Sequence, residues 1–126
     1  MAYRRPAFLV RHAFNPAAMR LGIGGAQRLT VTRRRSGTTQ EIPVIPIEVQ
    51  GARYLVSARG ETDWVKNVRA ASGSGRLDGK SFSATEVPIP ERGPILAVYQ
   101  QVAGRAVQSH FKALPDSRDH PVFRLS

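Results

Sequence analysis

Short stretches of alternating apolar and polar residues, separated by only a few positions, constrain the fold of this chain more than any other feature. In the first, residues 27–34, Leu29 and Val31 alternate with threonines, which is typical of a half-buried strand. The second, residues 39–49, alternates again but contains two prolines, which cannot donate hydrogen bonds to a neighbouring strand. We therefore expect this second strand to be bulged or to lie at the edge of a sheet.

A third strand follows the second directly. Gln50-Gly51 suits a tight turn, and residues 53–57 have the composition of the returning strand. Three consecutive strands joined by short turns form a meander. A meander is stable only when it closes on itself or is covered by a helix.

Two helices are predicted to interrupt the strands. An apolar stripe at helical spacing predicts a helix over residues 63–71, with Thr62 as its N-cap. A longer helix is expected over residues 94–113, in which the interior Gly104 marks a bend or a close packing contact. These helices are candidates to cover the sheet.

The remaining segments complete a small β fold. The Asp-Gly pair within residues 76–80 is a strong hairpin signal, residues 81–89 form its returning strand, and residues 122–125 form a last strand. Short helices are expected in a basic N-terminal segment, residues 1–25. With about six antiparallel strands, we expect a mainly β, α+β fold, a small closed or split β-barrel in which residues 1–126 form a single domain.

The net charge is +10, and the positive charge is unevenly distributed. Residues 1–40 hold eight arginines and no acidic residue, and all nine acidic residues lie from Glu41 onward. Such an imbalance indicates an anionic partner. Nucleic acid, an acidic membrane surface and a polyanionic small molecule all satisfy it.

Composition excludes several classes of protein. The chain has no cysteine, so disulfide scaffolds and thiolate metal sites are ruled out, and its three histidines have no metal-ligand spacing. No apolar run approaches the roughly 20 residues that span a bilayer. We expect a cytoplasmic, metal-free protein. Residues 3–14 are basic and amphipathic, and they either pack on the barrel or lie on a membrane surface.

No conventional catalytic constellation is present, but the residues allow a phosphate to be bound. Arg34, Arg35 and Ser36 follow the first strand, where guanidinium groups, a hydroxyl and the N–H groups of a glycine turn can hold a phosphate. Arg59 precedes a predicted helix N-terminus, which also favours anions. A solvated basic strand end is the alternative interpretation. Phosphate sites without reacting side chains are typical of proteins whose cofactor carries the chemistry.

Three segments together resemble the deazaflavin-dependent nitroreductase family of actinobacteria. They are Arg-Arg-Arg-Ser-Gly at residues 33–37, the block Gly-Ala-Arg-Tyr-Leu-Val-Ser-Ala-Arg-Gly-Glu-Thr-Asp-Trp-Val-Lys-Asn-Val-Arg-Ala-Ala at 51–71, and His-Pro-Val-Phe-Arg-Leu at 120–125. The resemblance covers nearly the whole chain. It implies a split β-barrel that binds coenzyme F-420.

The resemblance also implies roles for particular residues. Arg34, Arg35 and Ser36 match the segment that holds the cofactor phosphate. Further residues match the strand that lines the deazaflavin ring, the loop along the cofactor and the helix start beside it: Gln40, Ile42, Pro43, Val44, Ile45, Pro46, Val56, Ser57, Ala58, Arg59, Asp63, Trp64, Val65, Lys66 and Asn67. Tyr99 is the candidate proton donor, with a core aromatic as its alternative role.

Three functions are therefore open. The first is an F-420-dependent reductase (an oxidoreductase) of a hydrophobic acceptor such as a quinone, an enone or a nitro compound, with FMN as an alternative cofactor. The second is a binding or carrier protein for F-420 or FMN without turnover. The third is a single-stranded nucleic-acid binder, which needs aromatic stacking platforms beside the basic residues. None stands beside the arginine cluster, so nucleic acid ranks last, and either a monomer or a homodimer is compatible with the sequence.

Overall fold

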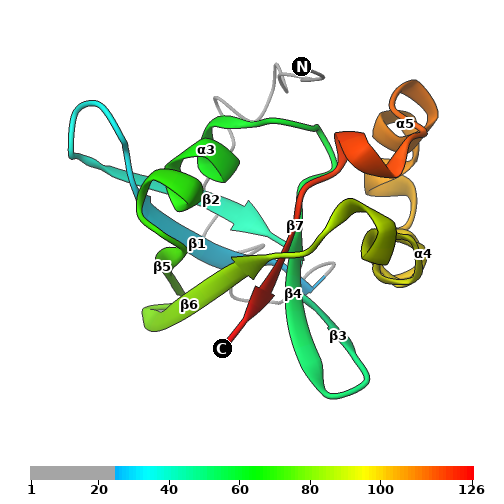
Figure 1. The fold of residues 1–126 in the computed structure, drawn as a ribbon, viewed down its shortest axis with the longest axis horizontal. Helices are drawn as coiled ribbons and strands as arrows, with labels where there is room; N and C mark the ends of the chain where they lie inside the picture. Colours follow the sequence, from blue (N-terminus) through cyan, green and yellow to red (C-terminus); the bar gives the residue numbers. More distant parts are fainter. Residues whose placement is uncertain (1–24) are drawn as a thin grey trace.

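The computed structural model describes residues 25–126 (Figure 1). The predicted basic helical segment, residues 1–25, falls outside the described residues except for Gly25. The predicted contact of residues 3–14 with a membrane falls wholly outside them.

Seven antiparallel strands form one curled sheet in the described chain (Figure 1). The strands are β1 (Gln27–Thr32), β2 (Thr39–Val44), β3 (Ile47–Val49), β4 (Ala52–Val56), β5 (Ser74–Leu77), β6 (Lys80–Glu86) and β7 (Val122–Leu125). Their order is β2-β1-β5-β6-β7-β4-β3. The two edge strands, β2 and β3, are consecutive in the chain, so the sheet must curl until its edges come together. The expected α+β split barrel is confirmed.

The single strand predicted over residues 39–49 is in fact two strands. The ladder of β2 ends at Val44, and β3 begins at Ile47 and pairs with a different neighbour, β4. Pro46 cannot donate to either ladder, so the chain bends there. Pro43 therefore lies in an edge strand, as expected, and Pro46 lies between the two edge strands. The change of pairing at Pro46 divides the predicted strand in two, so the sheet has seven strands instead of about six.

Both predicted hairpin turns have the expected backbone. Gln50 and Gly51 have φ of 50° and 80°, and Asp78 and Gly79 have φ of 49° and 82°. Positive φ at both central residues is typical of a type I′ turn, which matches the twist of the flanking strands. Asp78 also accepts a hydrogen bond at Oδ1 from the backbone N–H of Arg28 at 2.8 Å, which fastens this turn to β1.

Three α-helices of the described chain pack on the sheet, and a short 3₁₀ turn precedes α4 and another follows α5. They are α3 (Asp63–Ala70), α4 (Arg92–Ala103) and α5 (Arg105–Ala113), with η2 (Ile89–Glu91) and η3 (Ser117–Asp119). The long helix predicted over residues 94–113 is broken. Gly104 has φ 58° and ψ −135°, a conformation outside the helical region that glycine adopts readily. The bend expected at this glycine is a complete interruption.

The core has two halves, one on each face of the sheet. Leu29, Leu55, Val65 and Phe123 belong to the half that contains α3, whereas Ile95, on α4, belongs to the other half. In Figure 1, α3 lies beside β1 and β2, and α4 and α5 lie at the far side of β4. Along β4 and β7, consecutive side chains alternate between the halves: Leu55 and Phe123 belong to the half with α3, and Val56 and Val122 belong to the other.

Gly73→Ala is expected to destabilise the fold far more than Gly79→Ala. Both glycines have positive φ, 89° and 82°, so both alanines incur about 1–2 kcal/mol of backbone strain. A Cβ at Gly73 would also lie 2.1 Å from the carbonyl oxygen of Ala84, whereas a Cβ at Gly79 meets no atom within 4 Å. Urea unfolding of the two variants measures the difference. Equal losses would contradict the close approach.

Candidate functional site

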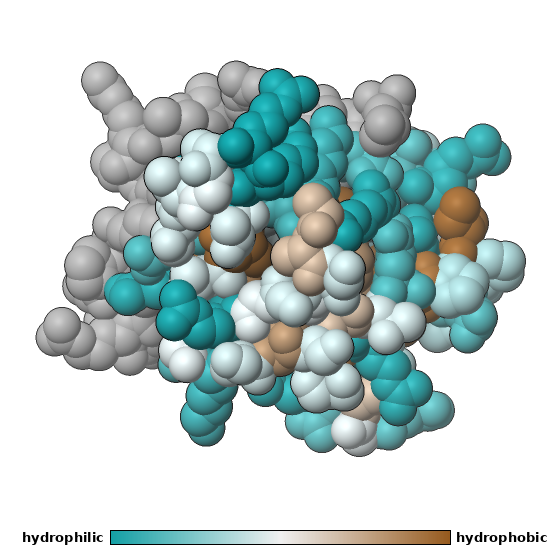
Figure 2. Space-filling view, turned by 60° about the vertical axis from the view of Figure 1, so that its left-hand side comes forward, coloured by the Kyte–Doolittle hydropathy of each residue, from teal (hydrophilic) through white to brown (hydrophobic). Residues whose placement is uncertain are grey.

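A cationic pocket of about 190 Å³ lies where the β1–β2 turn meets β2 and the start of α3. We call it the arginine pocket, and its lining residues are Arg33, Arg34, Arg35, Ser36, Gln40, Asp63 and Asn67. Figure 2 turns the side of the molecule that carries this turn toward the viewer. Hydrophilic residues cover much of that face, and hydrophobic residues show only in small patches.

The turn itself is held by its own hydrogen bonds. The backbone N–H of Arg33 donates to the carbonyl of Thr38 at 2.8 Å, and that of Gly37 donates to the carbonyl of Arg33 at 3.0 Å. The Arg33 guanidinium donates to Thr38 Oγ1 at 3.0 Å and to the carbonyl of Thr39. Arg33 therefore stabilises the turn that presents the next two arginines.

Asn67 connects three parts of the arginine pocket. Its Oδ1 accepts from the backbone N–H of Arg34 at 3.1 Å and from Arg34 Nη1 at 2.8 Å, and its Nδ2 donates to Gln40 Oε1 at 2.7 Å. Asn67 is only 2% exposed. One buried amide thus joins the turn, β2 and α3. Because Gln40 accepts through its oxygen, its amide N–H groups are left to donate into the pocket.

The charges of the arginine pocket do not cancel. Three arginines face one carboxylate, that of Asp63, which lies 3.6 Å from Arg34 Nη2. Arg35 makes no hydrogen bond or ion pair with another residue in 25–126, and its side chain is exposed. The pocket is therefore suited to an anion, and Arg35 is the arginine with its donors still available.

A second pocket, of about 200 Å³, adjoins the first along β2 and α3. We call it the central pocket, and its lining residues are Pro43, Val44, Ile45, Val56, Ser57, Ala58, Arg59, Thr62, Trp64, Tyr99, Ala106, Val107 and His110. β2 contributes Gln40 to the first pocket and Pro43 to the second. The start of α3 likewise contributes Asp63 to one and Trp64 to the other. The central pocket is mainly apolar, with a few polar groups between its apolar walls.

Ser57 shapes the loop beside the central pocket. Its backbone N–H donates to the carbonyl of Pro121 at 2.9 Å, its hydroxyl donates to the carbonyl of Gly60 at 2.5 Å, and its own carbonyl contacts Nδ1 of His120 at 3.0 Å. Ser57 is 1% exposed. Its polar groups are thus already used within the fold, and they fix the loop that carries Arg59.

His120 joins this loop to the end of α5. Its Nε2 lies 2.5 Å from the carbonyl oxygen of Leu114, and its ring stacks on Phe111 with centroids 4.0 Å apart and planes 13° apart. The residue is fully buried. His120 therefore has a structural role, because it holds α5 in place as one wall of the central pocket.

Tyr99 lies on the α4 wall of the central pocket and is 5% exposed. Burial raises the pKa of Tyr99 to about 12, and the positive charge of Arg59 opposes part of that rise. The hydroxyl is consequently protonated at neutral pH. Tyr99 can donate a proton or a hydrogen bond into this pocket.

Most of the predicted site residues line one of the two pockets, but four do not. Val65 is fully buried in the core under α3, and Ile42, on β2, packs against that same core half. Pro46 and Lys66 lie outside both linings. Five lining residues were not assigned to the site from the sequence, and three of these come from α5: Arg33, Thr62, Ala106, Val107 and His110.

Two structural findings concern metals and membranes. No group of three or more histidine, aspartate or glutamate side chains that could hold a metal lies together within residues 25–126. No helix in the described part of the chain is long and apolar enough to cross a bilayer.

Asn67→Ala should lower the free energy of unfolding by roughly 1–3 kcal/mol, because it leaves Arg34 and Gln40 without their buried partner. Lys66→Ala is the matched control, since Lys66 is the preceding residue of α3 and is only half-buried, and it should cost about 0.5 kcal/mol or less. Chemical denaturation of both variants tests this. Losses of equal size would show that the amide does not hold the pocket together.

Comparison with known proteins shows the fold but no assigned family. No protein-family model and no curated protein matches this chain. Among solved structures, an F-420 reductase superposes with a TM-score of 0.52 at 12% identity, over 79% of this chain and 83% of that one. Campylobacter jejuni ChuZ superposes with a TM-score of 0.59 at 12% identity, over 90% of this chain and 53% of the ChuZ chain. A domain-swapped dimer superposes with a TM-score of 0.50 at 20% identity, over 80% of this chain and 79% of that one. This chain spans about half the length of ChuZ, and it has the fold that these proteins share.

Proposed function

We propose that this protein is a deazaflavin-dependent oxidoreductase that transfers a hydride from reduced coenzyme F-420 to a hydrophobic acceptor such as a quinone, an enone or a nitro compound. One observation carries the proposal: a cationic pocket and a mainly apolar pocket adjoin along β2 and the start of α3. The resemblance of residues 33–37 and 51–71 to F-420-binding proteins supports the same cofactor. So does the fold, which an F-420 reductase also has.

The residues of the two pockets fit this cofactor in charge and polarity. A phosphodiester and a glutamyl tail are anionic, and three arginines outnumber one carboxylate in the arginine pocket. A flat aromatic ring suits apolar walls with a few polar groups at fixed positions, which is the composition of the central pocket. When bound, the reduced cofactor supplies the hydride.

The protein's own groups bind, orient and exclude water. Arg34 is held by Asn67 and Arg35 is available, so together they present two guanidinium groups to a phosphate. Trp64 and Val107 are buried in the walls and keep water from the ring. Tyr99, protonated at neutral pH, supplies the proton that a reduced acceptor requires.

Two alternatives use the same pockets. FMN also carries a phosphate and a tricyclic ring, so it is the alternative cofactor. A carrier without turnover would bind F-420 or FMN equally well and would lack an acceptor. Single-stranded nucleic acid is the remote alternative, because Trp64, which follows Asp63 of the arginine pocket in the sequence, is 4% exposed and offers no stacking platform.

We further propose that the protein acts in the cytoplasm as a monomer or a homodimer. The domain-swapped dimer with the same fold supports the homodimer. Peripheral membrane contact through residues 3–14 would bring the protein close to hydrophobic acceptors.

Titration of the purified protein with coenzyme F-420, and in parallel with FMN, tests the cofactor by fluorescence. Arg35→Ala should weaken F-420 binding by about 10-fold or more, because it removes a charge-assisted hydrogen bond worth roughly 1.5–3 kcal/mol. It should leave thermal stability unchanged, since Arg35 has no partner within residues 25–126. Arg34→Ala should weaken binding and also lower stability, because Arg34 donates to Asn67.

Arg76→Ala is the control for net charge, since Arg76 is an exposed arginine on β5 away from both pockets. It should bind F-420 as the wild type does. Equal binding by wild type and Arg35→Ala would refute the phosphate site. Preference for FMN over F-420 would move the protein to the flavin alternative.

Tyr99→Phe should lower the turnover number by about 100-fold with a quinone or enone acceptor, the lower range for loss of a general acid, while F-420 binding is unchanged. The ring is retained, so packing against Phe111 survives. Because the pKa is about 12, the tyrosine keeps its proton below that value, and the wild-type rate should show no fall from this group between pH 6 and 10, as a stopped-flow pH profile would test. Unchanged turnover in the variant would make Tyr99 a core aromatic only.

A further inference from the structure

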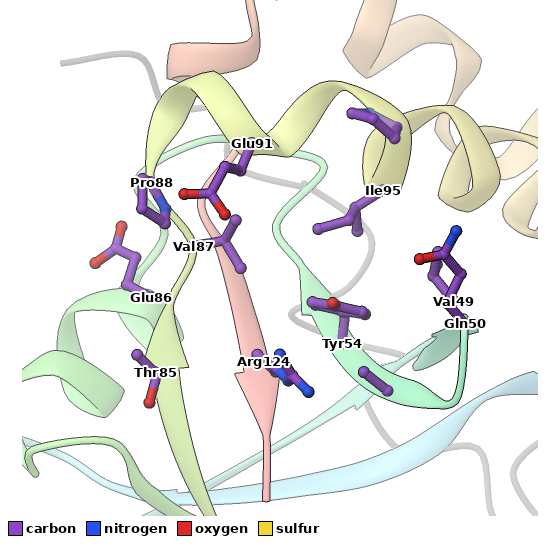
Figure 3. A pocket seen from close by; sticks show the side chains of 12 residues that line it. Val49, Gln50, Tyr54, Thr85, Glu86, Val87, Pro88, Glu91, Ile95 and Arg124 are labelled. Carbon is purple, nitrogen blue, oxygen red and sulfur yellow. The ribbon is translucent and has the colours of Figure 1, made fainter.

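A separate cavity of about 600 Å³ opens beside the first turn of α4 (Figure 3). It is bounded by the β3–β4 hairpin, the end of β6, β7 and the segment from η2 into α4. None of its lining residues belongs to the arginine pocket or the central pocket. The proposed function makes no use of it.

The floor of this cavity is a row of polar side chains across three strands. Thr85 pairs with Arg124, and Arg124 pairs with Tyr54, so all three side chains stand on one face of the sheet. Val122 stands on the same face two residues earlier and is fully buried in the core half that contains α4. Arg124 is exposed, and the row marks the point at which the helix stops covering the sheet.

Two opposite charges in the cavity are uncompensated. Neither Arg124 nor Glu91 makes a hydrogen bond or ion pair through its side chain with any residue in 25–126. The other lining carboxylate, Glu86, is already bound by Arg69 Nη2 at 2.7 Å and by Arg92 Nη2 at 3.2 Å. In Figure 3, Glu91 points from η2 toward Val87, and Arg124 lies on the sheet next to Tyr54.

Apolar side chains separate the two charges. Val87 and Ile95 are 8% and 7% exposed, and Val49 closes the side formed by the hairpin. The cavity thus offers a cation with a neighbouring phenol on its floor, a carboxylate at its rim and an apolar wall between them. The complementary ligand carries a carboxylate, an ammonium and an apolar group.

We propose that this cavity binds a small zwitterion of the apolar α-amino acid class. The guanidinium of Arg124 and the hydroxyl of Tyr54 bind its carboxylate, and Glu91 binds its ammonium. Its side chain covers Val87 and Ile95. The site is independent of the cofactor pockets, so binding does not require F-420.

L-phenylalanine titrated into the full chain and followed by NMR chemical shifts or calorimetry tests the proposal. A ligand of this size is expected to bind with a Kd in the millimolar range. L-phenylalaninamide lacks the carboxylate and N-acetyl-L-phenylalanine lacks the ammonium, so each should bind at least about 10-fold more weakly than L-phenylalanine.

Variants assign each charge to its group. Arg124→Gln should weaken the binding of L-phenylalanine by about 10-fold and leave the already weak binding of L-phenylalaninamide unchanged. Glu91→Gln should likewise weaken the binding of L-phenylalanine by about 10-fold and leave the already weak binding of N-acetyl-L-phenylalanine unchanged. Arg53→Gln is the control, since Arg53 lies on β4 next to Tyr54 but lines a different pocket. It should bind as the wild type does.

Two outcomes would overturn the proposal. One is the absence of saturable binding of L-phenylalanine. The other is a loss in Arg53→Gln equal to that in Arg124→Gln. The same variants are expected to bind F-420 as the wild type does. A wrong amino-acid site would therefore appear as missing L-phenylalanine binding with F-420 binding intact, and a wrong cofactor as missing F-420 binding in every variant and in the wild type. Glu91 and Arg124 are exposed, and thermal melts verify that their variants fold.

Discussion

The rest of the structure depends on the constraint that the two edges of the sheet are neighbours in the chain. β2 pairs only with β1 and β3 only with β4, yet Ile45 and Pro46 alone separate them. The chain cannot form a flat sheet with this strand order, because the outer strands β2 and β3 would lie too far apart for two residues to connect. The curl brings the end of β2 opposite the end of β4. This is why Val44 and Val56 line the same pocket.

A second connection then sets the position of the helical wall. His120 contacts the carbonyls of Ser57 and Leu114, so it ties the loop after β4 to the end of α5. Arg92 works in a similar way at the start of α4, where its Nη1 donates to the carbonyls of Arg118 at 3.4 Å and His120 at 3.5 Å. Asn67, Arg92 and His120, all buried, thus each join segments that are distant in sequence. Hydrogen bonding to several partners at once makes such groups specify one arrangement.

Local signals in the sequence predicted most of the strands, the two tight hairpin turns and the start of α3 correctly, because each depends on residues within a few positions of one another. The effects of Pro46 and Gly104 were only partly predictable. Each was recognised as an interruption, but whether a segment bends or changes its partner depends on the tertiary contacts that follow.

The site divides in the same way. The arginine pocket is built mostly from a turn and a helix start whose residues stand together in the sequence, so its composition was expected. The contribution of α5 was not, because the face that Val107 and His110 present depends on the break at Gly104 and on the fastening by His120. Ser57 illustrates the limit for polar residues, since the sequence does not reveal that its hydroxyl is already bound to Gly60.

The place of β7 in the sheet has a consequence for biosynthesis. β7 lies between β6 and β4 and hydrogen-bonds to both, although its residues are synthesised after those of every other described strand. Until residues 122–125 leave the ribosome, β4 and β6 each present an unpaired edge, and such edges invite association with other nascent chains. Translation at about 5–20 residues per second keeps this interval to a few seconds after β6 has emerged. The growing chain is thus most prone to such association between the completion of β6 and the arrival of β7.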